Sequence, residues 1–208
     1  MSEDLVLYTT PMSRGRIARW MLEEVGAPYR AELMNFGPGM KDPAFRAINP
    51  MGKVPALRHG DAVVTETAAI CAYLADAFPE AGLAPPVSDR ADYYRWLFFA
   101  AGPIEHSWVD RAIGATPTPE QQRMVGYGSF EAVFETLDAM LADREYVAAN
   151  RFSAADVYLG SQLGFGMEFG MIEKRPAFTT YVARLTARPA WIRARETDEA
   201  LTPKRETA

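Results

Sequence analysis

The spacing of hydrophobic residues divides the first 80 positions into short strands and helices. Brief apolar runs predict strands at 5–8, 29–34, 54–57 and 62–64. Apolar residues three or four positions apart predict helices at 17–25, 43–48 and 65–78. The resulting order, β-α-β-α-β-β-α, is typical of a compact mixed sheet covered by helices.

Beyond residue 80 the pattern becomes helical. The stretch "PEAGLAPPVSDR" (79–90) is rich in proline and glycine, which is typical of a connection between domains. We therefore expect a mixed α/β domain over residues 1–80, a linker over 81–87 and an all-helical domain over 88–208. Within the helical half, "FSAADVYLG" carries Ser153 and Asp156 in a capping-box pattern, which favours the start of a buried helix.

Composition narrows the classes of function. The chain has 22 Lys and Arg against 27 Asp and Glu, a net charge of -5, so it lacks the basic surface that nucleic-acid binding requires. No apolar run approaches the roughly 20 residues of a membrane span, and the acidic start "MSEDLVLY" is unlike a leader segment. Cys71 is a single cysteine among apolar neighbours, so we expect an inert buried thiol, no internal disulfide and no metal site. These features predict a cytoplasmic protein without nucleic-acid or membrane partners.

Three motifs together point to a family. They are "NPMGKVPAL" (49–57), "TETAAICAYLADAFP" (65–79) and "FSAADVYLG" (152–160), with the linker between the second and the third. In this order and spacing, the chain resembles the cytosolic glutathione transferases of bacterial type over nearly its whole length. The resemblance implies a thioredoxin-like α/β domain followed by an all-α domain, and usually a homodimer. It also implies an enzyme that conjugates the thiolate of its co-substrate glutathione to small hydrophobic electrophiles.

The helix that starts near residue 66 can bind one end of glutathione, a tripeptide with two carboxylates and an ammonium group. The free N–H groups and the dipole of a helix N-terminus favour a carboxylate, and the hydroxyl of Thr67 adds a donor. Glu66 can meet the ammonium of the same γ-glutamyl group. The alternative is that this pair only caps the helix, as most such pairs do.

The segment "GKVPAL" can bind the rest of the tripeptide. The residue before a proline is biased toward extended backbone, which suits Val54 to hydrogen-bond the cysteinyl backbone. In the family the Val54-Pro55 bond is cis, although Pro55 also has a simpler role as a rigid turn. Lys53 and Lys41 are candidates for the glycine carboxylate, and each can instead be an ordinary surface lysine.

Two hydroxyls in "LYTTPMSRGRIARWMLEE" (7–24) are candidates for stabilising the thiolate. In relatives this role belongs to a tyrosine that ends the first strand or to a serine or cysteine five residues later, and this chain has both Tyr8 and Ser13. We favour Ser13, because it precedes the helix whose N-terminal dipole also attracts an anion. The alternatives are that Ser13 is a plain helix cap and that Tyr8 packs its ring in the core.

The electrophile pocket and the assembly are less defined by the sequence. Met12 and Trp108 are candidates for the apolar pocket and can equally belong to the core. Glu105 and His106, on the first helix of the C-terminal half, are candidates for residues that face the substrate. His59 is expected at the surface of a hairpin turn. An aromatic group at Tyr93, Tyr94 and Trp96 exceeds what one core needs, which favours a homodimer.

Two other classes of function stay open on the same fold. One is a glutathione-dependent lyase, dehalogenase or reductase, although the absence of a cysteine after the first strand argues against disulfide exchange. The other is a noncatalytic glutathione-binding protein. Retention of the glutathione-contacting positions argues against that class.

Overall fold

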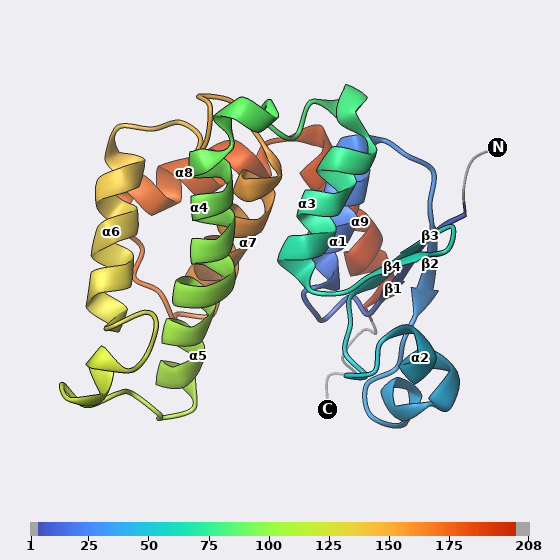
Figure 1. Cartoon of the computed structure of the whole chain (residues 1–208), viewed down its shortest axis with the longest axis horizontal. Coiled ribbons are helices and arrows are strands. Elements are labelled where there is room, and N and C mark those ends of the chain that lie inside the picture. The colour runs from blue at the N-terminus through green and yellow to red at the C-terminus, as the bar shows by residue number, and fades with distance from the viewer. Residues whose placement is uncertain (1–3, 203–208) are drawn as a thin grey trace. The chain divides into compact units, whose positions relative to one another are not determined.

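The computed structural model describes residues 4–202 and divides them into two compact units (Figure 1). The first unit contains residues 4–81 together with 188–202, and the second contains residues 82–187. The boundary after residue 81 falls at the start of the proline-rich connection.

A mixed four-stranded sheet forms the centre of the first unit. Its strands are β1 (Leu5–Thr9), β2 (Arg30–Leu33), β3 (Ala56–His59) and β4 (Ala62–Val64), in the spatial order β2-β1-β3-β4. The pair β1 and β2 is parallel, whereas β1 with β3 and β3 with β4 are antiparallel. This arrangement confirms the α/β class predicted from the hydrophobic pattern.

Helices complete the first unit. They are α1 (Gly15–Val25), α2 (Pro43–Ile48), α3 (Thr67–Ala77) and α9 (Pro189–Leu201), with 3-10 turns η1 (Pro38–Lys41) and η2 (Pro79–Ala81). Helices α1 and α3 pack side by side, and the apolar residues of these helices and of the sheet are buried together, among them Leu7, Ile17, Met21, Leu57 and Leu74. Helix α1 ends at Gly26, whose φ of 70° lies in the left-handed region that glycine adopts most easily.

Helix α9 belongs to the first unit, which differs from the expectation of one helical domain over 88–208. It packs along α1, and both helices lie with α3 in the same part of Figure 1. The sequence pattern predicts that α9 is a helix, because periodicity is a local property. Its packing partner depends on contacts with residues far away in the chain, which periodicity does not encode.

Opposite charges align α9 with α1. Among the ion pairs of the described residues, Arg188–Glu24, Arg193–Glu23 and Asp198–Arg19 join α9 and its N-cap Arg188 to α1. The paired positions on α1 run from 24 to 19 as those on the α9 side run from 188 to 198, so the two helices are antiparallel. The Asp198–Arg19 pair is fully buried, and removal of one partner from such a pair costs about 3–5 kcal/mol.

The second unit is helical throughout. Its elements are η3 (Val87–Asp89), α4 (Ala91–Phe99), α5 (Glu105–Ala112), η5 (Gln121–Arg123), α6 (Phe130–Ala142), α7 (Ala154–Glu168) and α8 (Pro176–Thr186). One π-helical turn, η4 (Ala100–Ile104), joins α4 to α5 and contains Pro103, which has no N–H for the helical ladder. None of the helices within residues 4–202 is both long and apolar enough to cross a membrane.

The predicted capping box opens α7. The side chains of Ser153 and Asp156 each accept from the backbone of the other position, and Asp156 also accepts from Val147 N and Tyr181 Oη at 2.9 and 2.8 Å. Burial nevertheless raises the pKa of Asp156 to about 6, because its hydrogen bonds only partly offset the loss of water. Further along α7, a side chain at Gly160 would overlap Leu185 of α8. That glycine therefore permits the close approach of the two helices.

Candidate functional site

Three loop segments meet at one end of the first unit's sheet. Tyr8 pairs with Ala56 across β1 and β3, and Leu57 pairs with Val64 across β3 and β4. Since both pairs of strands are antiparallel, the end of β1, the start of β3 and the end of β4 lie at the same end of the sheet. Most candidate residues of the first unit lie in the segments that adjoin this end of the sheet, at 10–15, 49–55 and 65–67, whereas Tyr8 is in β1 and Lys41 is in η1.

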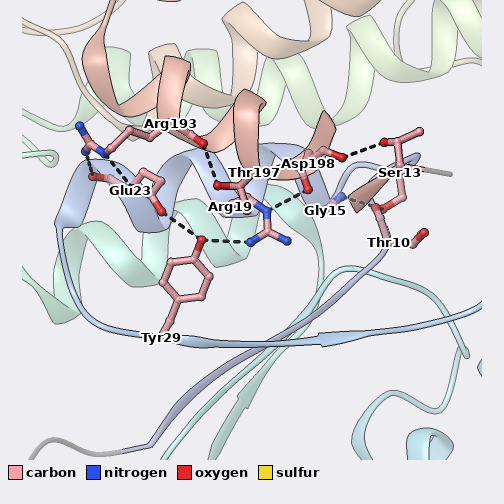
Figure 2. Close-up of polar contacts among 10 residues, drawn as sticks. Thr10, Ser13, Gly15, Arg19, Glu23, Tyr29, Arg193, Thr197 and Asp198 are labelled. Atoms are coloured by element: carbon pink, nitrogen blue, oxygen red, sulfur yellow. Dashed lines mark hydrogen bonds and ion pairs between the residues drawn. The ribbon is translucent and has the colours of Figure 1, made fainter. Parts of the chain in front are cut away.

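The hydroxyl of Ser13 is held inside the turn that follows β1. Its Oγ donates to the carbonyl of Thr10 at 2.8 Å and accepts the N–H of Gly15, the first residue of α1, at 2.9 Å (Figure 2). Ser13 thus supports the start of α1, as the simpler interpretation of this serine requires. A hydroxyl proton can rotate, so its donation to Thr10 can be redirected to an anion while Gly15 continues to donate to Oγ.

Tyr8 packs its ring in a small apolar cluster. The ring lies 5.9 Å from that of Phe45, centroid to centroid, and the cluster also contains Met40 and Ala56 with Val54 packed against it. Tyr8 is only partly buried, so its ring fills space beside the segment that enters β3. This position agrees with the interpretation of Tyr8 as a packing residue.

The segment before β3 is shaped by a cis peptide bond and a glycine. The Val54-Pro55 bond is cis, as the resemblance implied. Neither the N–H nor the C=O of Val54 bonds to another backbone group within residues 4–202, which leaves both for an extended ligand. Gly52 has a φ of 60°, and a Cβ there would lie 2.5 Å from the carbonyl oxygen of Met40. Only glycine allows this close approach of the loop to η1.

The N-terminus of α3 is strained and carries no side-chain cap. Glu66 occupies the N-cap position with φ 63° and ψ 118°, a conformation that L-residues rarely adopt, and its side chain caps no N–H. Such strain is concentrated at ligand sites. Glu66 is exposed and Thr67 is buried at the first helical position. The first turn of α3 therefore offers free N–H groups with a carboxylate beside them.

Lys41 and Lys53 are both exposed, and they lie on neighbouring segments. Met40 directly precedes Lys41 and Gly52 directly precedes Lys53, and the backbones of Met40 and Gly52 approach each other closely. The Asn49 side chain donates to the carbonyl of Lys53 at 2.7 Å, which fixes the backbone of the loop. Both ammonium groups are therefore accessible to an anion from solvent.

The residues proposed for an electrophile pocket divide between the units. Met12 is 64% exposed in the turn next to Ser13. Glu105, His106 and Trp108 lie on α5 in the second unit, where His106 is exposed and Trp108 is half-buried. Glu105 accepts hydrogen bonds from Tyr158 and Gln162 of α7, so within its own unit it ties two helices together.

Cys71 and His59 are both packed against other side chains of the first unit. Cys71 is buried in α3, and burial raises the pKa of the Cys71 thiol far above its usual range, which makes it inert as expected. His59 is not a free surface residue of the turn. It ends β3, contacts the hydroxyl of Tyr73 at 2.9 Å and stacks on Phe78, because its side chain faces α3 and the residue after it. No group of three or more metal-binding side chains occurs within residues 4–202.

Sequence reasoning missed the role of Gly15. A Cβ at this position would overlap Oγ1 of Thr9, a fully buried residue at the end of β1. Gly15 therefore lets α1 begin directly against the strand and offers its N–H to Ser13. The signal in the sequence was a glycine at the start of a predicted helix, where alanine would be the better helix former.

Comparisons with known proteins agree with this geometry. Residues 12–77 match the family model for the glutathione S-transferase N-terminal domain, and residues 96–189 match the model for the C-terminal domain. Glutathione S-transferase hmp2 of Hypomyces subiculosus is 28% identical over 207 residues, covering 90% of this chain and 96% of its own.

Two solved structures have the same fold. A glutathione transferase from Methylococcus capsulatus str. bath superposes with a TM-score of 0.75 at 30% identity, covering 94% of this chain and 99% of its own. A sphingomonad glutathione S-transferase complexed with glutathione gives a TM-score of 0.74 at 30% identity, covering 93% and 98%. The chain therefore belongs to the cytosolic glutathione transferase family. It is a glutathione S-transferase enzyme.

Proposed function

We propose that this glutathione S-transferase binds glutathione at the end of the sheet described above and conjugates its thiolate to small hydrophobic electrophiles. The observation that carries the proposal is that three features lie together at that end of the sheet. They are the uncapped N-terminus of α3 with its strained Glu66, the unpaired backbone of Val54 and the hydroxyl of Ser13.

Each part of glutathione has a complementary group. The γ-glutamyl carboxylate accepts from the first N–H groups of α3 and from the Thr67 hydroxyl, while Glu66 binds the ammonium. The cysteinyl backbone pairs with Val54 as an added strand would, beside Pro55. The glycine carboxylate meets Lys53, with Lys41 as a second cation.

Ser13 is the proposed thiolate stabiliser. A shift of the thiol pKa from about 8.5 to about 6.5 needs roughly 2.7 kcal/mol of preferential stabilisation of the thiolate. A charge-assisted hydrogen bond supplies about 1.5–3 kcal/mol, more than the neutral bond to Thr10 that Ser13 gives up. The ionised thiol then attacks the electrophile without a protein base.

Exposed apolar side chains support a hydrophobic second substrate. Met12 lies one residue before Ser13 and is 64% exposed, which is suited to contact an apolar electrophile near the thiolate. Cys71 is buried and cannot form a mixed disulfide with glutathione, so a protein-thiol reductase is not supported. The reaction class suits detoxification in the cytoplasm, where glutathione is kept reduced.

Assembly as a homodimer is part of the proposal. Tyr94 and Phe98 lie four residues apart on α4 and are 44% and 66% exposed. They form one apolar stripe on the helix, whereas Tyr93 and Trp96 belong to the core. A second copy would bury this stripe.

Turnover and binding assays test the function directly. Purified full-length protein is incubated with glutathione and an activated aryl chloride, and mass spectrometry identifies the product. We expect a thioether of glutathione and release of chloride. Release of oxidised glutathione with a reduced electrophile would contradict conjugation, and binding without any turnover would indicate a noncatalytic protein.

A further inference from the structure

A buried carboxylate of α9 packs against α1, the helix that follows Ser13 in the chain. Asp198 of α9 and Arg19 of α1 are 1% and 2% exposed, and Arg19 Nε donates to Asp198 Oδ1 at 2.8 Å. Arg19 Nη1 also donates to the hydroxyl of Tyr29 at 3.1 Å. We propose that Asp198 is a positioning residue for the glutathione thiol, because it fixes through Arg19 the end of α1 that presents Ser13.

The path from Asp198 to Ser13 is short and made of rigid parts. Arg19 lies about one helical turn after Gly15, whose N–H donates to Ser13 Oγ at 2.9 Å. Arg16, between these two residues, donates its backbone N–H to the carbonyl of Ser13 at 3.2 Å. The backbone of α1 therefore connects the buried ion pair to both polar groups of Ser13.

Electrostatics ties Asp198 to this same part of α1. Burial raises the pKa of Asp198, while the positive charges of Arg19 and Arg16 act in the opposite direction. Two guanidinium groups from neighbouring turns of α1 thus act on one carboxylate from α9. Asp198 therefore experiences positive charge from each of the first two turns of α1.

In the described part of the chain, Asp198 is one of two side chains that accept hydrogen bonds from the Arg19 guanidinium, so the orientation of that group depends on Asp198. Within residues 4–202, Arg19 Nη2 and Asp198 Oδ2 are both buried and have no hydrogen-bond partner. The guanidinium is held by Asp198 on one side and by Tyr29 on the other (Figure 2). Tyr29 donates in turn to Glu23, which pairs with Arg193 of α9.

The other α1–α9 pairs lie toward the opposite end of α1. Arg193 and Arg188 bind Glu23 and Glu24, near the C-terminus of the helix. Arg193 is linked to Arg19 through Glu23 and Tyr29, so it belongs to the same network. The Arg188–Glu24 pair is the control, because its loss weakens the α1–α9 interface near the C-terminus of α1 and thus separates a positioning effect from general destabilisation.

The test rests on the proposed function and compares Asp198→Asn with Arg188→Gln. Both variants remove one charge from the α1–α9 interface, and the readout is the pKa of bound glutathione, followed by its thiolate absorbance. In Asp198→Asn we expect this pKa to rise by about 0.5 unit, which lowers kcat/KM about threefold below the pKa, with KM for glutathione within about twofold of wild type. In Arg188→Gln we expect no change in the thiol pKa.

A milder variant covers the case in which Asp198→Asn does not fold. Tyr29→Phe removes only the hydroxyl that accepts from Arg19, and a smaller rise of the thiol pKa is expected. An unchanged pKa in folded Asp198→Asn, or in Tyr29→Phe if the first variant is unfolded, would overturn the proposal. A lowered pKa would also overturn it, since Asp198 would then act as a repelling charge. If wild type itself shows no thiolate absorbance with glutathione, the proposed function has failed instead.

Discussion

Glu24 of α1 accepts two parallel hydrogen bonds from Arg188, at 2.7 Å from Nε and 2.8 Å from Nη2, across 164 positions of sequence. The carboxylate is 5% exposed and also accepts from Trp20 Nε1 at 2.8 Å. A bidentate guanidinium–carboxylate pair is both strong and directional. It therefore fixes where α9 begins along α1.

Removal of Arg188 should destabilise the protein measurably. Arg188→Ala removes two of the hydrogen bonds that the buried Glu24 carboxylate accepts and leaves the one from Trp20, so we expect a loss of about 1–3 kcal/mol in the free energy of unfolding. Denaturant titration followed by circular dichroism measures it. The control is Arg195→Ala on the same helix, which breaks an exposed pair with Glu199 and should cost less than about 0.5 kcal/mol. Equal losses in the two variants would contradict the role of Arg188.

Substitution of Ser13 and substitution of Tyr8 should have different effects on the pKa of the bound glutathione thiol. Ser13→Ala should raise the pKa of the bound thiol by about 1–2 units, because a charge-assisted hydrogen bond of about 1.5–3 kcal/mol is lost. Tyr8→Phe should leave it unchanged, since the ring packs against Phe45 in either variant. A pH titration of thiolate absorbance decides between them. If only Tyr8→Phe raises the pKa, the tyrosine is the stabilising group; if neither does, backbone N–H groups hold the thiolate.

Glu66 should contribute to binding at the expense of stability. Glu66→Ala and Glu66→Gly both remove the carboxylate, so calorimetry should find glutathione binding weakened about tenfold in each. Their stabilities should differ, because glycine accepts the φ of 63° and alanine does not, and we expect Glu66→Gly to be more stable by about 1 kcal/mol. Glu80→Ala, at an exposed carboxylate of η2, is the control for binding. Wild-type affinity in both Glu66 variants would remove this residue from the site, and the same result for Lys53→Ala would remove the lysine.

Asp156 gives the protein a defined response to pH. Its pKa is raised from 3.8 to about 6 in the folded state, so the native protein binds more protons than the unfolded chain between these values. The contribution of Asp156 to stability is therefore largest below about pH 4 and falls as the pH rises to about 6. Relative to Asp156→Asn, which does not titrate, wild type should lose on the order of 3 kcal/mol across this window. Denaturant titrations at several pH values check this, and a difference that does not vary with pH would contradict the raised pKa.

Charge introduced on the α4 stripe should disrupt the proposed dimer. Phe98→Glu should shift the mass measured by light scattering from twice the 23.1 kDa of one chain toward a single chain, because a carboxylate would be buried in the interface. Met124→Glu is the matched control, since Met124 is 86% exposed on a loop of the same unit. A wild-type mass near 23.1 kDa would reject the dimer outright.

Local patterns in the sequence predicted much of the fold. Apolar spacing gave the strands of the sheet and most helices, and the Ser153 and Asp156 pattern predicted the capping box, because each depends on residues within a few positions. The unit to which α9 belongs was not predictable in this way. The pairs that fix it join residues 164–179 positions apart.

The candidate site was predictable in its residue types and not in its geometry. The expected helix start and the motif identified Glu66 as a candidate. Its positive φ belongs to the short turn between β4 and α3, which the residue types alone do not predict. Ser13 was identified as a helix cap or a thiolate donor, and its two hydrogen bonds depend on Gly15 lying against Thr9. Such contacts follow from packing, which single positions in a sequence do not encode.

The packing of α9 on α1 also sets the order in which the units can fold during synthesis. The second unit is continuous in sequence and can complete its core as soon as α8 has left the ribosome. The first unit starts to emerge earlier but lacks α9. Arg19 and its neighbours on α1 therefore have no α9 to pack against until the residues from 188 onward have been made. The part of the chain made first is thus finished last, and a chain truncated before residue 188 would contain all of the helical unit and only part of the sheet unit.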